Sequence, residues 1–145
     1  MTLPRQRISL VTLGVADLAR AQAFYEALGW VPAEARAEFA CYQLHGQALM
    51  LFGRADLAAD QGRPGAELGT GAMTLAQNFD SRVEVDAAFA AALVAGAKAL
   101  KAPVPVFWGG YSGYFADPDG HVWELAHNPF WPLSANGSLT LPVPA

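Results

Sequence analysis

Two stretches of the chain show the same change of hydrophobic period, from the alternation of a strand to the spacing of a helix. In residues 8–30, ISLVTLGVADLARAQAFYEALGW, apolar and β-branched residues alternate at first, and from Asp17 apolar residues recur every three or four positions. Asp17 suits a helix N-cap because its carboxylate can accept hydrogen bonds from the free amides of the first turn. Gly29 supplies the left-handed residue that ends many helices. This stretch predicts a strand followed by a helix.

The second stretch, residues 71–98, repeats this scheme in GAMTLAQNFDSRVEVDAAFAAALVAGAK. A strand leads to Ser81, and Glu84 follows three residues later, which is the spacing of a capping box. A stripe of apolar residues then runs to Gly96. The second stretch therefore also predicts a strand and a helix.

Each predicted helix leads into residues with the pattern of a β-hairpin. FACYQL and QALMLFGR flank His45-Gly46, and GYSGYFA and HVWELAHN flank the turn sequence DPDG, residues 117–120. Each half of the chain thus consists of a strand, a helix and at least two further strands. We expect one α+β domain over residues 1–145, with these parts: module one at about 8–53, a linker at 54–71, module two at about 72–127 and a tail at 128–145.

The linker and the tail lack the periodicity of the modules. The linker RADLAADQGRPGAELGTG has Gly, Pro and mixed charges without a sustained period. The Pro-rich tail is expected to pack as an extended cover, in which Leu139 and Leu141 could form a short edge strand.

Composition excludes several classes of function. The chain has 145 residues, of which 53% are hydrophobic, so it can bury a core. Its net charge of −4, without a basic run, argues against binding to nucleic acid or an anionic membrane surface. Cys41 is the single cysteine, which excludes an intrachain disulfide and a Cys-based zinc site. No signal segment or apolar stretch of membrane-spanning length is present, so we expect a cytoplasmic protein.

The paired units, the opening GVADLARAQAFYEALGW and the ending YFADPDGHVWEL resemble the vicinal oxygen chelate superfamily. That superfamily includes glyoxalase I, bleomycin and fosfomycin resistance proteins and extradiol dioxygenases. The resemblance covers residues 8–127 and implies two βαβββ modules whose sheets curl into an incomplete barrel around a cavity, with the helices outside. It also implies a homodimer. It does not fix the function, because the scaffold hosts lyases, oxygenases and binding proteins.

The resemblance implies four metal positions, because metal-using members take one ligand from the first strand and one from the last strand of each module. Combined with the internal repeat, it places these positions at Leu10, Met50, Thr74 and Glu124. Leucine and methionine have no useful affinity for a hard or borderline divalent ion, and one carboxylate with waters is a weak site. We therefore expect no metal cofactor. The histidines do not change this expectation, because His121 and His127 lie an odd number of residues from Glu124 and His45 lies in a hairpin turn.

Glu124 lies between the same-face apolar neighbours Val122 and Ala126. A carboxylate in such surroundings suits a general acid or base, or an anchor for a ligand amine or hydroxyl. It could equally be a carboxylate that only satisfies nearby hydroxyls or amides. Tyr114 lies ten residues earlier, where fosfomycin-resistance members have a tyrosine that faces the cavity, so the resemblance makes it the expected partner of Glu124. An ordinary half-buried strand tyrosine is the alternative.

Aromatic residues concentrate late in the chain, with eight of the sixteen between positions 107 and 131. Trp108 and Tyr111 lie in a glycine-rich segment that we interpret as a loop at the mouth of the barrel. Such residues can stack on a flat ligand, so we expect both to contact it; core packing is the alternative for each.

Two functions are consistent with these residues. The first is a metal-free protein of the sequestration or resistance type that binds a small apolar or aromatic molecule, with ligand contacts from Leu10, Met50, Thr74, Trp108, Tyr111, Tyr114 and Glu124. The second is an enzyme of the lyase or dioxygenase type. In that case Glu124 and Tyr114 are catalytic, and Glu124 acts as a base or holds a weakly bound divalent metal.

Overall fold

The computed structural model describes residues 2–144, which form two compact units with the boundary between Leu68 and Gly69. Each unit has its own four-stranded sheet, and neither sheet closes on itself into a barrel. The α+β class and the two βαβββ modules are confirmed. The boundary falls inside the segment predicted as a linker.

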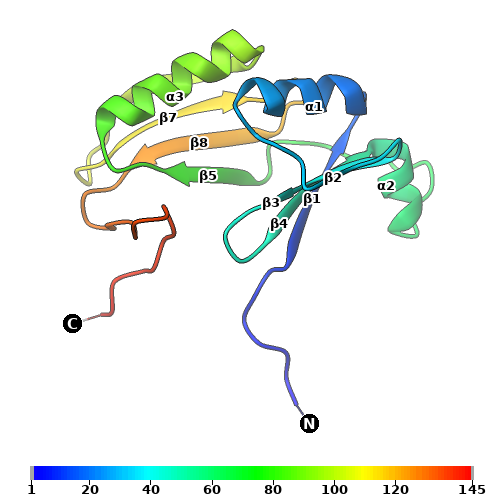
Figure 1. Ribbon diagram of the computed structural model, residues 1–145, viewed down its shortest axis with the longest axis horizontal. Coiled ribbons are helices and arrows are strands. Elements are labelled where there is room, and N and C mark those ends of the chain that lie inside the picture. Colours follow the sequence, from blue (N-terminus) through cyan, green and yellow to red (C-terminus); the bar gives the residue numbers. More distant parts are fainter. Residues whose placement is uncertain (1, 145) are drawn as a thin grey trace. The chain divides into compact units, whose positions relative to one another are not determined.

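The first unit contains one sheet and two helices (Figure 1). Strand β1 pairs in parallel with β4, which continues antiparallel to β3 and then to β2. The elements are β1 (Leu10–Val15), α1 (Leu18–Ala27), β2 (Glu34–Ala35), β3 (Phe39–Gln43), β4 (Ala48–Gly53) and α2 (Arg54–Asp60).

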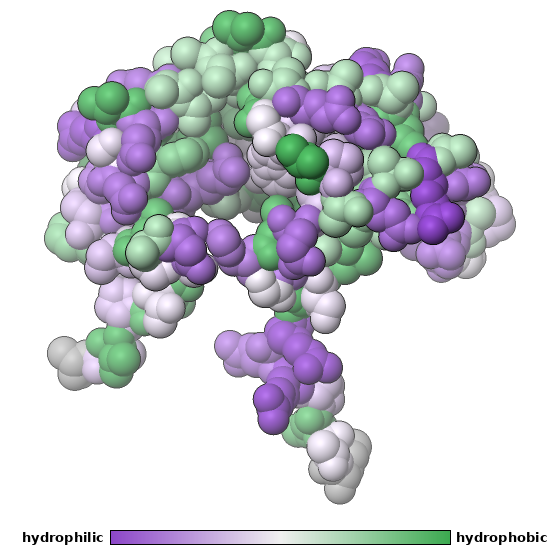
Figure 2. Space-filling view, viewed as in Figure 1, coloured by the Kyte–Doolittle hydropathy of each residue, from purple (hydrophilic) through white to green (hydrophobic). Residues whose placement is uncertain are grey.

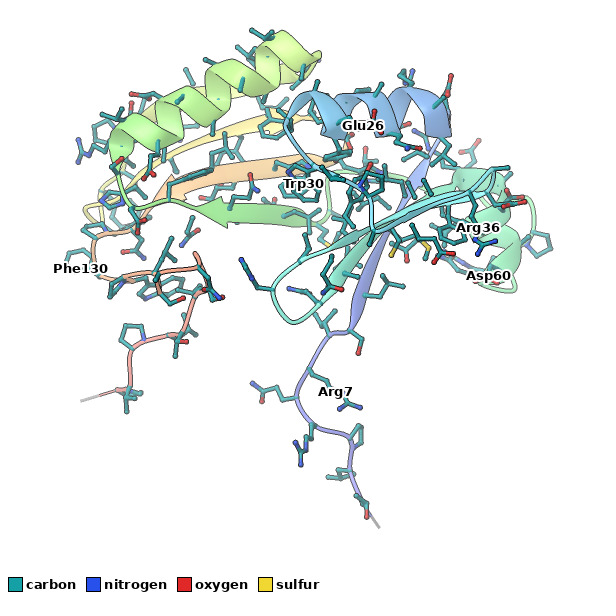
Figure 3. The ribbon with its side chains drawn as sticks, viewed as in Figure 1. Arg7, Glu26, Trp30, Arg36, Asp60 and Phe130 are labelled. Atoms are coloured by element: carbon teal, nitrogen blue, oxygen red, sulfur yellow. The ribbon has the colours of Figure 1, made fainter. Side chains whose placement is uncertain are left out.

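Helix α1 begins where the sequence predicted, because the Asp17 carboxylate accepts a hydrogen bond from the Arg20 amide at 3.1 Å. Gly29 follows the helix with a φ of +90°. The core of the unit combines Tyr25 of α1 with the buried strand residues Leu13, Leu49, Leu51 and Tyr42. Trp30, labelled in Figure 3, packs its ring against Tyr25 and Tyr42, with centroids 5.4 and 5.5 Å away.

Helix α2 was not predicted, because its residues were assigned to the linker. RADLAAD consists mostly of good helix formers, and Ala58 is buried. A helix of seven residues is too short to show a clear helical period in the sequence. Packing of one face therefore stabilises a helix that the pattern alone could not indicate.

The second unit repeats the arrangement, with the strand order β5-β8-β7-β6. Strands β5 and β8 are parallel, and the other neighbours are antiparallel. The elements are β5 (Thr74–Asn78), α3 (Arg82–Ala95), β6 (Lys98–Pro105), β7 (Tyr111–Ala116) and β8 (Val122–His127).

Helix α3 begins at the predicted capping residues. The Glu84 amide donates to the Ser81 hydroxyl at 3.2 Å, and Gly96 ends the helix with a φ of +113°. The helix contacts β6, β7 and β8, and its outer surface leaves Val83 and Val94 exposed. Figure 2 shows hydrophobic residues at the surface over this helix.

The hairpin between β7 and β8 turns at residues 117–120, as predicted. The Asp117 amide donates to the His121 carbonyl at 2.9 Å, and one Asp117 carboxylate oxygen accepts from the amides of Asp119 and His121. Gly120 has a φ of +93°. This turn fixes which residues of β7 and β8 face each other.

Strand β6 was not predicted from the sequence, which indicated only the two hairpin strands after the second helix. The strand continues to Pro105, and a tight turn over residues 106–110 joins it to β7. Its pairing with β7 contains two register shifts, one between Ala99 and Lys101 and one between Lys101 and Val104. Edge strands tolerate prolines and register shifts of this kind. Such a strand lacks the regular alternation of apolar and polar residues from which strands are predicted.

Residues 128–144 form turns and extended segments rather than a further strand of the sheet. The expected edge strand at Leu139 and Leu141 is reduced to an isolated antiparallel bridge between Leu133 and Leu139. Within residues 2–144, no helix combines the length and the apolar character that crossing a membrane requires.

Gly113 allows β6 to approach β7 closely. A methyl group there would lie 2.8 Å from the Pro103 backbone nitrogen and 2.9 Å from the Lys101 carbonyl oxygen. We expect Gly113→Ala to lower the free energy of unfolding by about 2 kcal/mol, because backbone must move to make room. Urea denaturation measures this change. Gly69→Ala is the control, since no atom lies within 4 Å of its added methyl group, and an equal loss in both variants would contradict the explanation.

Candidate functional site

The two faces of the second sheet have different surroundings. Helix α3 covers one face, on which Phe115, Trp123 and Leu125 are buried (Figure 1). Side chains alternate along a strand, so Tyr114 and Glu124 project from the other face. We call this the open face. It carries Thr74, Ala76, Asn78, Ser112, Tyr114, Ala116, Val122, Glu124 and Ala126.

Tyr114 and Glu124 form a pair in the middle of the open face. They lie directly opposite each other on β7 and β8, and both are half-buried. Their side chains therefore face each other on this side of the sheet. Burial raises the pKa of Tyr114, and the neighbouring Glu124 carboxylate raises this pKa further through its charge and as a hydrogen-bond acceptor. The phenol therefore keeps its proton, and its role as a donor, at neutral pH.

The pair belongs to a row of four residues that crosses the sheet. Glu124 faces Ala76 on one side and Tyr114 on the other, and Tyr114 in turn faces Lys101. Thr74 lies on the same face but in the neighbouring row, opposite Val122. The small Ala76 side chain leaves the β5 side of Glu124 open to a bound group.

Leu10 and Met50 lie on the corresponding face of the first sheet, the face not covered by α1. Met50 pairs with Thr12 and Cys41, and Leu10 pairs with Ala48. All these residues are half-buried or exposed, whereas Leu13 and Leu51 on the other face are buried. The two modules are equivalent here, because Met50 opposite Thr12 matches Glu124 opposite Ala76.

Comparison with known proteins identifies the group to which this repeated unit belongs. The model of the Glyoxalase/Bleomycin resistance protein/Dioxygenase superfamily matches residues 7–125. The chain belongs to this superfamily.

Solved structures agree with this assignment. A glyoxalase-related enzyme from Fulvimarina pelagi is 36% identical, with a TM-score of 0.90, over 96% of this chain and 100% of its own. A glyoxalase/bleomycin resistance protein/dioxygenase from Nocardioides is 25% identical, with a TM-score of 0.71, over 87% and 85% of the two chains. Lactoylglutathione lyase from Agrobacterium tumefaciens shares the fold at 23% identity and a TM-score of 0.68, over 90% and 100%. No curated protein matches the chain.

The metal positions implied by the superfamily do not fit a divalent ion in this member. Of Leu10, Met50, Thr74 and Glu124, only Glu124 carries a carboxylate. Thr74 supplies a weak hydroxyl ligand, and it lies in a different row from Glu124. Within residues 2–144, no three His, Cys, Asp or Glu side chains converge in a way that could hold a metal.

The histidines lie apart from the Tyr114–Glu124 pair. His127 occupies the α3 side of β8, where its Nδ1 lies 2.9 Å from the Phe79 carbonyl oxygen. His121 is part of the turn before β8. His45 is in the turn between β3 and β4.

The structure does not bring Tyr111 to the Tyr114–Glu124 pair. Tyr111 lies three residues from Tyr114 on a regular strand, so its side chain projects toward α3. There its hydroxyl donates to the Asp86 carboxylate at 2.7 Å, and the Arg82 guanidinium lies 5.1 Å from its ring centre. The hydrogen bond to Asp86 raises the pKa of Tyr111. We expected Tyr111 beside the ligand because we interpreted its segment as a loop, whereas Tyr111 is the first residue of β7.

Trp108 lies in the β6–β7 turn, as the sequence indicated, and is 40% exposed. Its indole ring covers Gly110, where any side chain would collide with it. The adjacent Gly109 lies close to the ring of Phe130, labelled in Figure 3. The end of this hairpin therefore carries exposed aromatic rings, and contact between Trp108 and a ligand stays a prediction.

Lys101 is the polar residue of this row that the sequence did not indicate. Only its pairing with Tyr114 places it there, and that pairing depends on a register shift. A signal existed in composition, because Lys98 and Lys101 are the two lysines of the chain and both lie in β6.

The alkaline titration of Tyr114 tests the pair. We expect Glu124→Gln to lower the pKa of Tyr114, because the charge that opposes tyrosinate is removed, while burial keeps this pKa above the ordinary value. Carbon-13 NMR of the tyrosine rings follows each residue separately. Asp86→Asn is the control, which should lower the pKa of Tyr111 and leave Tyr114 unchanged. An unaltered Tyr114 titration in Glu124→Gln would show that the two groups are not in contact.

Proposed function

We propose that this chain binds a small, partly apolar molecule on the open face of its second sheet, without a divalent metal, as a sequestration or resistance type of protein. The cross-strand pair of Tyr114 and Glu124, half-buried in the middle of that face, is the observation that supports this proposal most strongly. Half-buried polar groups surrounded by apolar side chains are typical of ligand sites, in which few polar contacts fix the orientation of the ligand.

The chemistry of the pair indicates the complementary group on the ligand. A carboxylate offers about four lone-pair positions, of which the neighbouring Tyr114 hydroxyl can take at most one. The others can accept hydrogen bonds from an amine or a hydroxyl of the ligand. In the neighbouring row, the half-buried Val122 provides apolar surface for the rest of the molecule. An amphipathic ligand with a donor group fits these surroundings.

The donor set at the implied metal positions supports binding without a metal. Leu10 and Met50 carry no side-chain oxygen or nitrogen, so a divalent ion at the implied positions would depend on Glu124, Thr74 and water. A site of that kind binds weakly, and no step of the proposed function requires it.

An enzyme of the same superfamily is the second candidate. The similarity to a glyoxalase-related enzyme at 36% identity favours it. In that function Glu124 would take a proton from the bound substrate, and the Tyr114 hydroxyl would donate a hydrogen bond to the substrate oxygen on which charge develops. Its raised pKa keeps the phenol protonated for this role.

A homodimer and a cytoplasmic location also stay predictions.

Metal analysis of untagged protein tests the metal-free proposal. We expect divalent ions well below one per chain after purification and dialysis, because the donor set is too weak to retain them. Inductively coupled plasma mass spectrometry gives this ratio. One tightly held divalent ion per chain would contradict the proposal.

Fragment binding tests the assigned contact. Benzylamine and benzyl alcohol, followed by ¹H–¹⁵N NMR, should shift the resonances of β7 and β8. Glu124→Gln should weaken benzylamine binding about tenfold, because a charged hydrogen bond is lost, and should affect the alcohol less. Tyr111→Phe is the matched control, since that residue faces α3. Absence of binding by either fragment, or equal effects of the two variants, would contradict the site.

A further inference from the structure

The two lysines of the chain are close together in the fold. The sequence contains seven arginines but only two lysines among its nine basic residues, and its net charge is −4. Lys98 and Lys101 both lie in β6, the outermost strand of the second sheet, and both are exposed. Among the described residues, neither lysine forms an ion pair or a side-chain hydrogen bond. Two free cations thus lie at one edge of an acidic protein.

A β-bulge turns both lysines to the same face. Residues three positions apart on a regular strand project to opposite faces. Here the register shifts between Ala99 and Lys101, so Lys98 pairs with Ala116 and Lys101 pairs with Tyr114. Ala116 and Tyr114 are two residues apart on β7, and both belong to the open face. Bulges of this type commonly redirect a side chain next to a functional site.

The bulge favours a ligand-binding role for Lys101 over a role only in preventing this edge strand from pairing with another sheet. Lysine on an edge strand discourages pairing with the edge of another sheet, and a lysine on either face can do this. Protection alone therefore does not require Lys101 on the face of Tyr114 and Glu124. A ligand that reaches from the strand edge to Glu124 does require it.

We infer that Lys98 and Lys101 bind an anionic group, a carboxylate or a phosphate, of the small molecule that the open face holds. This inference rests on the proposed function, and it adds the class of ligand: a molecule with a hydrogen-bond donor at Glu124 and an anionic group toward β6. Neighbouring strands are about 4.8 Å apart, so the backbones of Lys101 and Glu124, two strands apart, are separated by about 10 Å. The flexible lysine side chains shorten the span that the ligand must cover. A zwitterionic or amphipathic molecule of modest size fits this spacing.

Three related probes test this inference separately from the proposed function. Benzylamine carries only the donor group, 4-(aminomethyl)benzoate adds a carboxylate, and 4-(aminomethyl)benzamide is its neutral counterpart. We expect the benzoate to bind about fivefold to tenfold more tightly than the benzamide in ¹H–¹⁵N NMR titrations, with the preference lost at high salt.

Charge-matched variants then assign the preference to the lysines. Lys98→Gln/Lys101→Gln should remove the preference for the benzoate. Arg5→Gln/Arg7→Gln should keep this preference, because the two lysines remain. The arginine variant is a matched control, since each double variant loses two positive charges. Arg7, labelled in Figure 3, lies on the N-terminal segment before β1. Each single variant, Lys98→Gln or Lys101→Gln, should lose part of the preference. The single variants test the role of the lysines if the double variant does not fold.

The possible results are distinguishable. Binding of all three probes with equal affinity would overturn the anion site and leave the proposed function standing. A benzoate preference that persists without the lysines would overturn their assignment. Failure of every probe to bind would contradict both proposals.

Discussion

The pairing register of β8 with its two neighbours is the constraint on which the second unit depends. Side chains alternate between faces along a strand, so a shift by one residue would turn Trp123 and Leu125 away from α3 and place Glu124 beneath it. Burial of the large apolar residues against α3 makes that shift unfavourable, and the hydrogen-bonded turn at residues 117–120 fixes the hairpin. The same alternation that builds the core therefore leaves a carboxylate and a phenol facing each other on the open face.

The edge of the sheet is less constrained than its centre, and its irregularity changes the chemistry of the open face. Strand β6 has a neighbour on one side only, so register shifts in it leave the β7–β8 pairing intact. The first shift brings Lys101 into the row of Tyr114 and Glu124. The close approach over Gly113 accompanies the second shift. A feature outside the core thus places a cation next to the Tyr114–Glu124 pair.

Much of this arrangement could be predicted from the sequence, because local signals determine it. Asp17, Ser81 and Gly96 mark helix ends by their own hydrogen-bonding and backbone preferences, and counting across the turn brings Tyr114 near Glu124. Non-local effects were missed. Helix α2 depends on packing. Tyr111 pairs with Pro105 at the end of β6, so it begins a strand and faces α3 instead of lying on a loop. A bulge is set by the pairing of two strands, so no pattern within β6 alone could place Lys101.

The central claim is that Tyr114 and Glu124 act as one interacting pair on the open face. A double-mutant cycle on the free energy of unfolding, with Tyr114→Phe, Glu124→Gln and the combined variant, measures their coupling without any ligand. The account predicts a coupling energy of about 1 kcal/mol, the usual net contribution of a side-chain interaction of hydrogen-bond strength. Strictly additive effects of the two substitutions would contradict it.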